Sequence, residues 1–253
     1  MKKFAPIFVL LLSQLSPSYA GGTSANTASG RWYLGGSMGA SYPEVTKNQY
    51  APNGDGWPDD RYISHNPNSS VLVSLTGGYT WFTQRDWLPS YSVGASYTYY
   101  FPNTVKGTIQ QYSLAQFENY NFQYQLKRQT VLAVLKATIF QYRRLMPFIS
   151  AGIGSSFNQM GNYIESPVSP DITPRVSPHF ENNRHSHFSY TLMAGIDYLV
   201  NANLWLGAGY RHGYFGDAQT GYGKSGYSTD YLKARVTDNA VVININYFFD
   251  HAA

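Results

Sequence analysis

Val-Val-Ile-Asn-Ile-Asn-Tyr-Phe-Phe, residues 241–249, is the stretch that decides the fold of this 253-residue chain. Successive side chains of an extended strand point to opposite faces. A strand that meets lipid on one face and a polar interior on the other needs one wholly apolar face. Here that face carries Val241, Ile243, Ile245, Tyr247 and Phe249, and the opposite face carries Val242, Asn244, Asn246 and Phe248.

The same period-two alternation recurs upstream, so the last strand is one of a set. A strand needs about 9–11 residues to cross a bilayer at a tilt, and the segments are about this long. We predict an all-β fold, an eight-stranded antiparallel transmembrane β-barrel. The predicted strands are residues 31–42, 71–81, 91–101, 124–139, 148–157, 187–198, 204–214 and 231–249.

The connections between these strands alternate strictly in length. The short ones are residues 82–89, 141–147 and 200–203, and the long ones are residues 43–70, 102–123, 158–186 and 216–230. Outer-membrane barrels have short periplasmic turns and longer extracellular loops. The alternation therefore predicts four long extracellular loops on one side of a bacterial outer membrane.

Charged side chains are rare within the predicted strands, and each falls on the polar face. A lipid-facing Arg or Lys at mid-depth costs about 2–4 kcal/mol, so this placement fits a polar interior. We expect the two acidic members of the set to pair with the two basic ones. The predicted interior charges are Lys136, Asp197, Arg211 and Asp238.

Aromatic side chains gather at both ends of the apolar faces, as expected for rings that prefer the two membrane interfaces. The girdle beside the short turns comprises Trp32, Trp81, Tyr91, Tyr198, Tyr247 and Phe249. The girdle near the long loops comprises Tyr42, Tyr99, Phe101, Phe188, Tyr190, Tyr210 and Tyr214.

The N-terminus has the pattern of a secretory signal, with Lys2 and Lys3 before the apolar residues 4–12 and the small residues Ser18 and Ala20 at the two recognised cleavage positions. This apolar stretch is shorter than the roughly 20 residues that span a bilayer. The predicted domains are a signal peptide (1–20), a polar linker (21–30), the barrel (31–249) and a periplasmic tail (250–253). Removing the signal would lower the formal charge from +4 to +2, which gives no argument for nucleic-acid binding. With no Cys in the chain, disulfides and thiolate metal sites are excluded.

Three stretches resemble the small outer-membrane barrels of the OmpA/OmpX and opacity-protein surface-antigen group. Residues 147–154 resemble the group's PF-x-x-G-x-G strand, residues 206–212 resemble its GaGYRy strand, and Tyr247-x-Phe249 is similar to its aromatic C-terminal signal. The resemblance implies a monomer in contact with outer-membrane lipid and lipopolysaccharide, inserted by the barrel-assembly machinery. The group usually ends on Phe, whereas residues 250–253 follow Phe249 here.

An eight-stranded barrel is just wide enough to be filled by its own side chains, so the function is expected to reside outside the lumen. The long loops are rich in Tyr, Asn, Ser and Gly, which is typical of recognition surfaces. We therefore expect a non-enzymatic structural or surface-interaction protein of the adhesin or surface-antigen type, with a host or cell-surface ligand. The alternative is a channel for small solutes or hydrophobic molecules, suggested by Phe157, Val242 and Phe248.

A lipid-modifying enzyme is the third hypothesis. His212 is placed like the His of lipid A deacylase barrels, but Gly213, Tyr214 and Phe215 stand where those enzymes have a Ser nucleophile. Two loop clusters offer metal ligands without a recognisable site pattern: Asp55, Asp59 and Asp60 lack the EF-hand spacing, and His179, His185 and His187 read as a polar loop. We expect no catalytic residue, cofactor or metal.

Overall fold

The computed structural model describes residues 29–52, 56–83, 85–174, 180–223 and 231–249. The predicted signal peptide, the tail, Asp55 and His179 lie outside these residues. The described elements are β1 Ser29–Val45, β2 Asn48–Ala51, β3 Asp60–Ser64, β4 Ser70–Phe82, β5 Trp87–Gln110, η1 Gln111–Ser113, η2 Ala115–Phe117, β6 Glu118–Phe140, β7 Leu145–Pro167, β8 Asn183–Leu199, β9 Leu204–Gln219 and β10 Lys233–Phe248. In this part of the chain no helix combines the length and apolar character that a helical membrane crossing requires.

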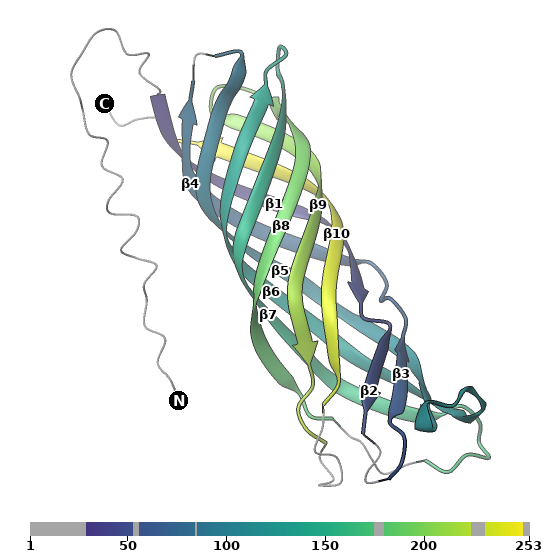
Figure 1. Ribbon diagram of the computed structural model, residues 1–253. Coiled ribbons are helices and arrows are strands. Elements are labelled where there is room, and N and C mark those ends of the chain that lie inside the picture. Colours follow the sequence, from purple (N-terminus) through teal and green to yellow (C-terminus); the bar gives the residue numbers. More distant parts are fainter. Residues whose placement is uncertain (1–28, 53–55, 84, 175–179, 224–230, 250–253) are drawn as a thin grey trace, which may run out of the picture.

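Eight strands form a closed antiparallel ring, which confirms the predicted barrel (Figure 1). Its order is β1-β4-β5-β6-β7-β8-β9-β10, with β10 pairing back onto β1. The connections 141–144 and 200–203 lie at one end of the barrel, together with the end of β4 and the start of β5, and this end is called here the turn end. The opposite end, called the loop end, lies at the bottom of Figure 1 and carries the β2–β3 hairpin.

The strands are tilted, as a path across their paired residues shows. The path starts at Asp197 on β8 and returns to the same strand at His187, ten residues away. A closed barrel needs such a stagger, and a larger stagger gives a wider interior. Every position on the path is a glycine or a polar residue: Asp197, Gly207, Asn244, Ser37, Ser74, Thr98, Thr130, Ser156 and His187.

The hydrophobic pattern reverses along the strands, and β6 shows this most clearly. In the half nearer the turn end, its outward residues are apolar, and Val131 and Leu135 are 49% and 60% exposed. Beyond Gln129 the outward residues become polar, and the inward ones become the buried Tyr120, Phe122, Tyr124 and Leu126. The first half therefore has the surface of a membrane-spanning barrel. The second, called here the loop-end half, has an apolar core and a polar exterior.

The prediction that residues 102–123 form a long loop is wrong. This segment is largely strand, because β5 and β6 remain paired from Asn103↔Leu126 to Gln110↔Glu118. Val105 and Ile109 are fully buried in the core of this extension, which stabilises it. Only residues 111–117 connect the two strands, as two short 3-10 turns. The predicted loop 43–70 likewise contains the β2–β3 hairpin, and β7 extends to Pro167.

The core of the loop-end half is rich in aromatic residues drawn from distant segments. Phe122 on β6 packs edge-on against Tyr62 on β3, with ring centroids 5.4 Å apart. Tyr163 on β7 packs in the same way against Phe180, at 5.0 Å. These contacts tie the hairpin and Phe180 to the long strands, so the extension is a packed body.

Tyr124 in this core makes the stability of the loop-end half dependent on pH. Burial raises the pKa of Tyr124 to about 12. Because the unfolded phenol ionises near pH 10, the stabilisation is complete below pH 10 and is lost as the pH rises towards 12. Between pH 8 and pH 11 we expect the wild type to lose about 1 kcal/mol more unfolding free energy than Tyr124→Phe. Urea unfolding at both pH values measures this difference, and parallel losses in the two proteins would contradict it.

Candidate functional site

The turn end of the lumen is closed by an aromatic plug. Tyr33, Met146, Trp205 and Phe248 are buried together there. The rings of Trp205 and Phe248 lie 4.5 Å apart, and Tyr33 lies 5.8 Å from Phe248. Sequence analysis placed Phe248 on the inward face but did not single out the others. The alternation of each strand already places these residues on its inward face, and this pattern could have identified them.

A small polar chamber lies next to this plug in the lumen, on the side towards the loop end. Its volume is about 110 Å³, room for a few water molecules. Hydroxyl pairs link neighbouring strands along its wall, with Ser74 and Thr98 2.9 Å apart and Thr76 donating to Ser96 at 3.0 Å. The chamber is therefore hydrophilic but far too small for an ordinary solute.

Lys136, which lines this chamber, forms an ion pair with the buried Asp197. The Lys136 Nζ lies 2.5 Å from Asp197 Oδ2, and the carboxylate is fully buried. Asn244 donates a second hydrogen bond to the same carboxylate at 3.3 Å. The ammonium also lies 3.9 Å from the centre of the Phe148 ring, a cation–π contact that adds to the burial of the charge.

Arg128 closes the chamber on its loop-end side. From β6 it reaches across the lumen to β10, where its Nη2 lies 3.5 Å from Asp238 Oδ2. The guanidinium lies 3.7 Å from the Tyr100 ring centre and 4.3 Å from the Phe215 ring centre. Ser41 on β1 donates to Asp238 Oδ1 at 2.5 Å. Since these groups come from five strands, they form a transverse layer.

We call this layer the septum: Ser41, Tyr100, Arg128, Arg211, Phe215 and Asp238. Arg211, expected to pair with an acidic residue, donates instead to the Tyr100 hydroxyl at 3.0 Å. Asp238 pairs with Arg128, which sequence analysis did not single out. Arg128 has the same strand parity as Lys136, so the alternation contained the signal that it faces inward.

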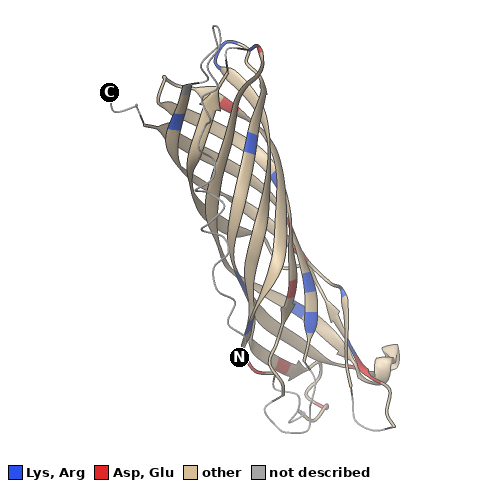
Figure 2. Ribbon diagram, turned by 60° about the vertical axis from the view of Figure 1, so that its left-hand side comes forward, with Lys and Arg blue, Asp and Glu red and all other residues tan. Residues whose placement is uncertain are grey.

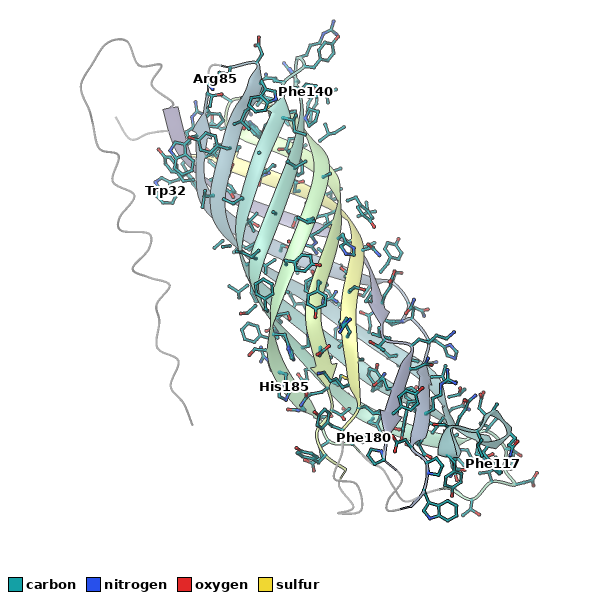
Figure 3. The ribbon with its side chains drawn as sticks, in the orientation of Figure 1. Trp32, Arg85, Phe117, Phe140, Phe180 and His185 are labelled. Atoms are coloured by element: carbon teal, nitrogen blue, oxygen red, sulfur yellow. The ribbon has the colours of Figure 1, made fainter. Side chains whose placement is uncertain are left out.

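The predicted girdle residues lie on the outer wall. Most are exposed, such as Trp32 and Phe188 at 64%, while Trp81, Tyr99 and Tyr214 are half-buried. Trp81 stacks on Tyr91 with centroids 5.2 Å apart. Trp32 marks the turn end in Figure 3. Figure 2 shows that charged residues gather towards the two ends, with a nearly uncharged band between them. The outer wall thus has the two interfaces that a membrane-spanning band requires.

His212 lies on the outer wall near the loop end. Its Nδ1 is 2.9 Å from the Asn239 side-chain oxygen, which also accepts from the Tyr210 hydroxyl at 2.7 Å. Asn239 in turn donates to Glu44 at 3.2 Å. The imidazole of His212 is thus hydrogen-bonded to an amide oxygen, whereas a Ser-activating base contacts a hydroxyl.

The described members of the two predicted metal-ligand clusters make other contacts. Asp60 is buried and accepts the backbone N–H of Tyr112 at 3.0 Å. His185 pairs with Gln219 at 2.8 Å, and its ring centre lies 6.1 Å from that of His187. Within the described ranges, no three His, Asp or Glu side chains come together as a metal site.

Comparison with known proteins gives a family and a set of similar folds. Residues 7–249 match the family model described as outer membrane protein beta-barrel domain. The structure is similar to Neisserial surface protein A, NspA, at 12% identity, with 86% of this chain and 97% of that chain covered and a TM-score of 0.46. The outer membrane protein OprG from Pseudomonas aeruginosa is 12% identical, with 88% of this chain and 97% of that chain covered and a TM-score of 0.47. The outer membrane protease OmpT from Escherichia coli is 11% identical, with 90% of this chain and 99% of that chain covered and a TM-score of 0.45. No curated protein sequence matches significantly.

Proposed function

Because the chain belongs to the outer membrane protein β-barrel domain family and lies in the bacterial outer membrane, we propose that it is a closed, non-enzymatic barrel that binds a surface partner. On this proposal the loop-end half projects from the cell, since outer-membrane barrels direct their longer connections outwards. The partner-binding surface is the tip of that half, in an adhesin-like or surface-antigen role.

The observation that carries the proposal is an exposed aromatic patch at the tip. Trp57 is 64% exposed and packs on Tyr112 with ring centroids 5.2 Å apart. Tyr112 in turn meets Phe117 at 6.1 Å, and Leu114 beside them is 44% exposed. Figure 3 places Phe117 at the far extremity of the loop end. Aromatic anchors of this kind dominate binding energy at protein interfaces, so the patch suits a protein partner.

The backbone beneath the patch is held in an uncommon conformation. Tyr112 and Ser113 have φ of 55° and 59°, the left-handed region that few non-glycine residues adopt. The buried Asp60 accepts the Tyr112 N–H, and Ser113 donates to the Asp59 carbonyl at 2.7 Å. These bonds fix the aromatic rings in advance, and a preorganised surface binds with a smaller loss of conformational entropy.

The alternative of a channel is less well supported, because three successive barriers fill the lumen. They are the aromatic plug, the septum and the apolar core of the loop-end half. The inward Val242 and Phe248, which suggested hydrophobic passage, are both buried within this packing. Phe157 lies on the outer wall, where the Arg184 guanidinium covers its ring at 5.3 Å.

The test compares tip and turn-end variants of the protein in lipid nanodiscs. We expect Trp57→Ala with Phe117→Ala to weaken attachment to host cells or extracellular matrix at least tenfold, since anchor truncations typically cost 2 kcal/mol or more. Trp87→Ala is the matched control, because Trp87 is 70% exposed at the turn end. Attachment that survives the double substitution would contradict the tip proposal. Steady openings of the wild-type protein in planar bilayers would favour the channel instead.

A further inference from the structure

A second candidate site lies on the outer wall of the loop-end half, away from the tip. It is a groove of about 1090 Å³ formed by β5, β6, β7 and the segment 65–69. Amides are the most frequent side chains in its walls, which also carry one Lys, one His and no Asp or Glu. The polar members are His65, Asn66, Asn68, Ser69, Asn103, Thr104, Lys106, Gln123, Gln125 and Asn162, together with Tyr124 and Tyr163.

Irregularities of three neighbouring strands coincide at this groove. The β5–β6 register shifts between Tyr100 and Asn103, and the β6–β7 register shifts between Gln123 and Gln125. Such bulges bend a strand and redirect its side chains. On β7, Asn162 has a φ of 52°, in the left-handed region. A backbone departure of this kind is retained when the surrounding structure fixes it, and it is common at binding sites.

Hydrogen bonds hold the walls of the groove in place. Asn103 donates from its side chain to the Asn68 carbonyl at 2.6 Å. Asn162 donates to the Gln125 side-chain oxygen at 2.8 Å. In contrast, no carboxylate among the described residues forms an ion pair with Lys106. The groove therefore combines a positioned amide framework with an uncompensated positive charge.

The position of the groove relative to the membrane indicates what can reach it. Tyr99 and Phe101 on β5 belong to the girdle near the loop end, and Pro102 and Asn103 at the groove follow them directly. The groove thus begins where the lipid-facing band ends. In the outer leaflet of this membrane, that level is occupied by the sugars and phosphates of lipopolysaccharide.

We propose that this groove binds an acidic oligosaccharide. Amides donate to and accept from sugar hydroxyls, and the Lys106 ammonium attracts a phosphate or carboxylate. Ile164, which is 53% exposed, offers an apolar surface for a sugar ring. Two sources share this chemistry: the phosphorylated core of a neighbouring lipopolysaccharide, and a uronate-containing glycan outside the cell. The site does not depend on the tip proposal, because it shares no residue with the aromatic patch.

The experiment titrates protein refolded in detergent without lipopolysaccharide. The probes are a deacylated, phosphorylated lipopolysaccharide core, the same core after dephosphorylation, and a uronate-containing oligosaccharide. We expect saturable binding of an acidic probe by calorimetry or NMR, and at least tenfold weaker binding to Lys106→Gln. Arg235→Gln is the matched control, since it removes the same charge from an exposed site on β10. Heat-modifiable gel migration identifies correctly folded variants.

The outcomes separate the site from general electrostatic attraction. Preference for the phosphorylated core supports the proposal with the cell's own lipopolysaccharide as ligand, and preference for the uronate probe supports it with an external glycan. Equal weakening by Lys106→Gln and Arg235→Gln would overturn the proposal. So would the absence of saturable binding of either acidic probe to the wild type.

Discussion

Replacing Asp238 with Ala should lower the free energy of unfolding by about 3–5 kcal/mol, the usual range for breaking a buried ion pair on one side. Asp238 is 1% exposed, and its partner Arg128 is 3% exposed. Removing the carboxylate leaves the guanidinium buried in the septum without its counter-charge, and it deprives the Ser41 hydroxyl of its acceptor. Urea unfolding in phospholipid vesicles, followed by Trp fluorescence, measures the change.

Asp217→Ala is the matched control for this prediction. Asp217 also pairs with a basic residue, since Lys233 Nζ lies 2.9 Å from its carboxylate, but the lysine is 53% exposed. An exposed pair contributes about 0–1 kcal/mol, so this substitution should have little effect. The double variant Arg128→Met with Asp238→Leu should recover much of the loss, because it leaves no unpaired charge. Similar losses in Asp217→Ala and Asp238→Ala would refute the role given to the septum.

Replacing Ile243 with Arg should cost about 2–4 kcal/mol of folding free energy, as expected for a cation placed against lipid at mid-depth. Ile243 is 56% exposed and lies midway along the membrane-spanning part of β10. Its neighbours on the outer wall are apolar, with Met38 and Ala208 paired beside it. An arginine there would lack a polar partner at that depth. The same vesicle unfolding assay, together with heat-modifiable migration, reports the effect.

Thr237→Arg controls for the size and charge of the new side chain. Thr237 lies on the same face of the same strand, six residues nearer the loop end. The native Arg235 already occupies this face two residues beyond it, so an arginine at 237 should cost little. Equal losses of folding free energy in Ile243→Arg and Thr237→Arg would contradict the prediction. They would show that the lipid-facing band does not end where the hydrophobic pattern reverses.

The sequence predicted the membrane-spanning half well because one physical constraint acts there on every strand. A residue such as Leu135 must be apolar where it meets lipid, and its neighbours Lys136 and Thr138 can be polar where they face the lumen. That constraint repeats every two residues and survives without any knowledge of tertiary contacts. The outward positions of Trp32 and Phe188 follow from the same rule.

The loop-end half was missed because the rule reverses there. Phe122 and Tyr124 face inward, so the alternation of residues 118–126 has the opposite sense to that of residues 130–139 and reads as a polar loop. The β2–β3 hairpin depends on β3 pairing with the far end of β5, a contact between distant segments. The tip patch and the wall groove depend on these same contacts and bulges, which have no local signature.

The partners in the ion pairs could not be predicted from the alternation of apolar and polar residues, for a different reason. Parity places Arg128, Arg211 and Asp238 on the inner face but does not say which of them meet across the lumen. That depends on the barrel stagger and on the reach of each side chain past Tyr100 and Phe215. The ring stacking on Arg128 fixes the pairing, and it involves residues far apart in sequence.

The reversal of the hydrophobic pattern between Gln129 and Val131 also fixes the depth at which the barrel sits in the membrane. A shift of the whole barrel by two residues towards the cell would bring Gln129 into hydrocarbon, and the opposite shift would expose Val131 to water. Each long strand that carries the reversal resists both displacements, so the molecule has a single preferred depth. The strand sequences therefore determine how far the tip extends from the membrane. A partner at the cell surface would meet the tip at a constant distance from the membrane.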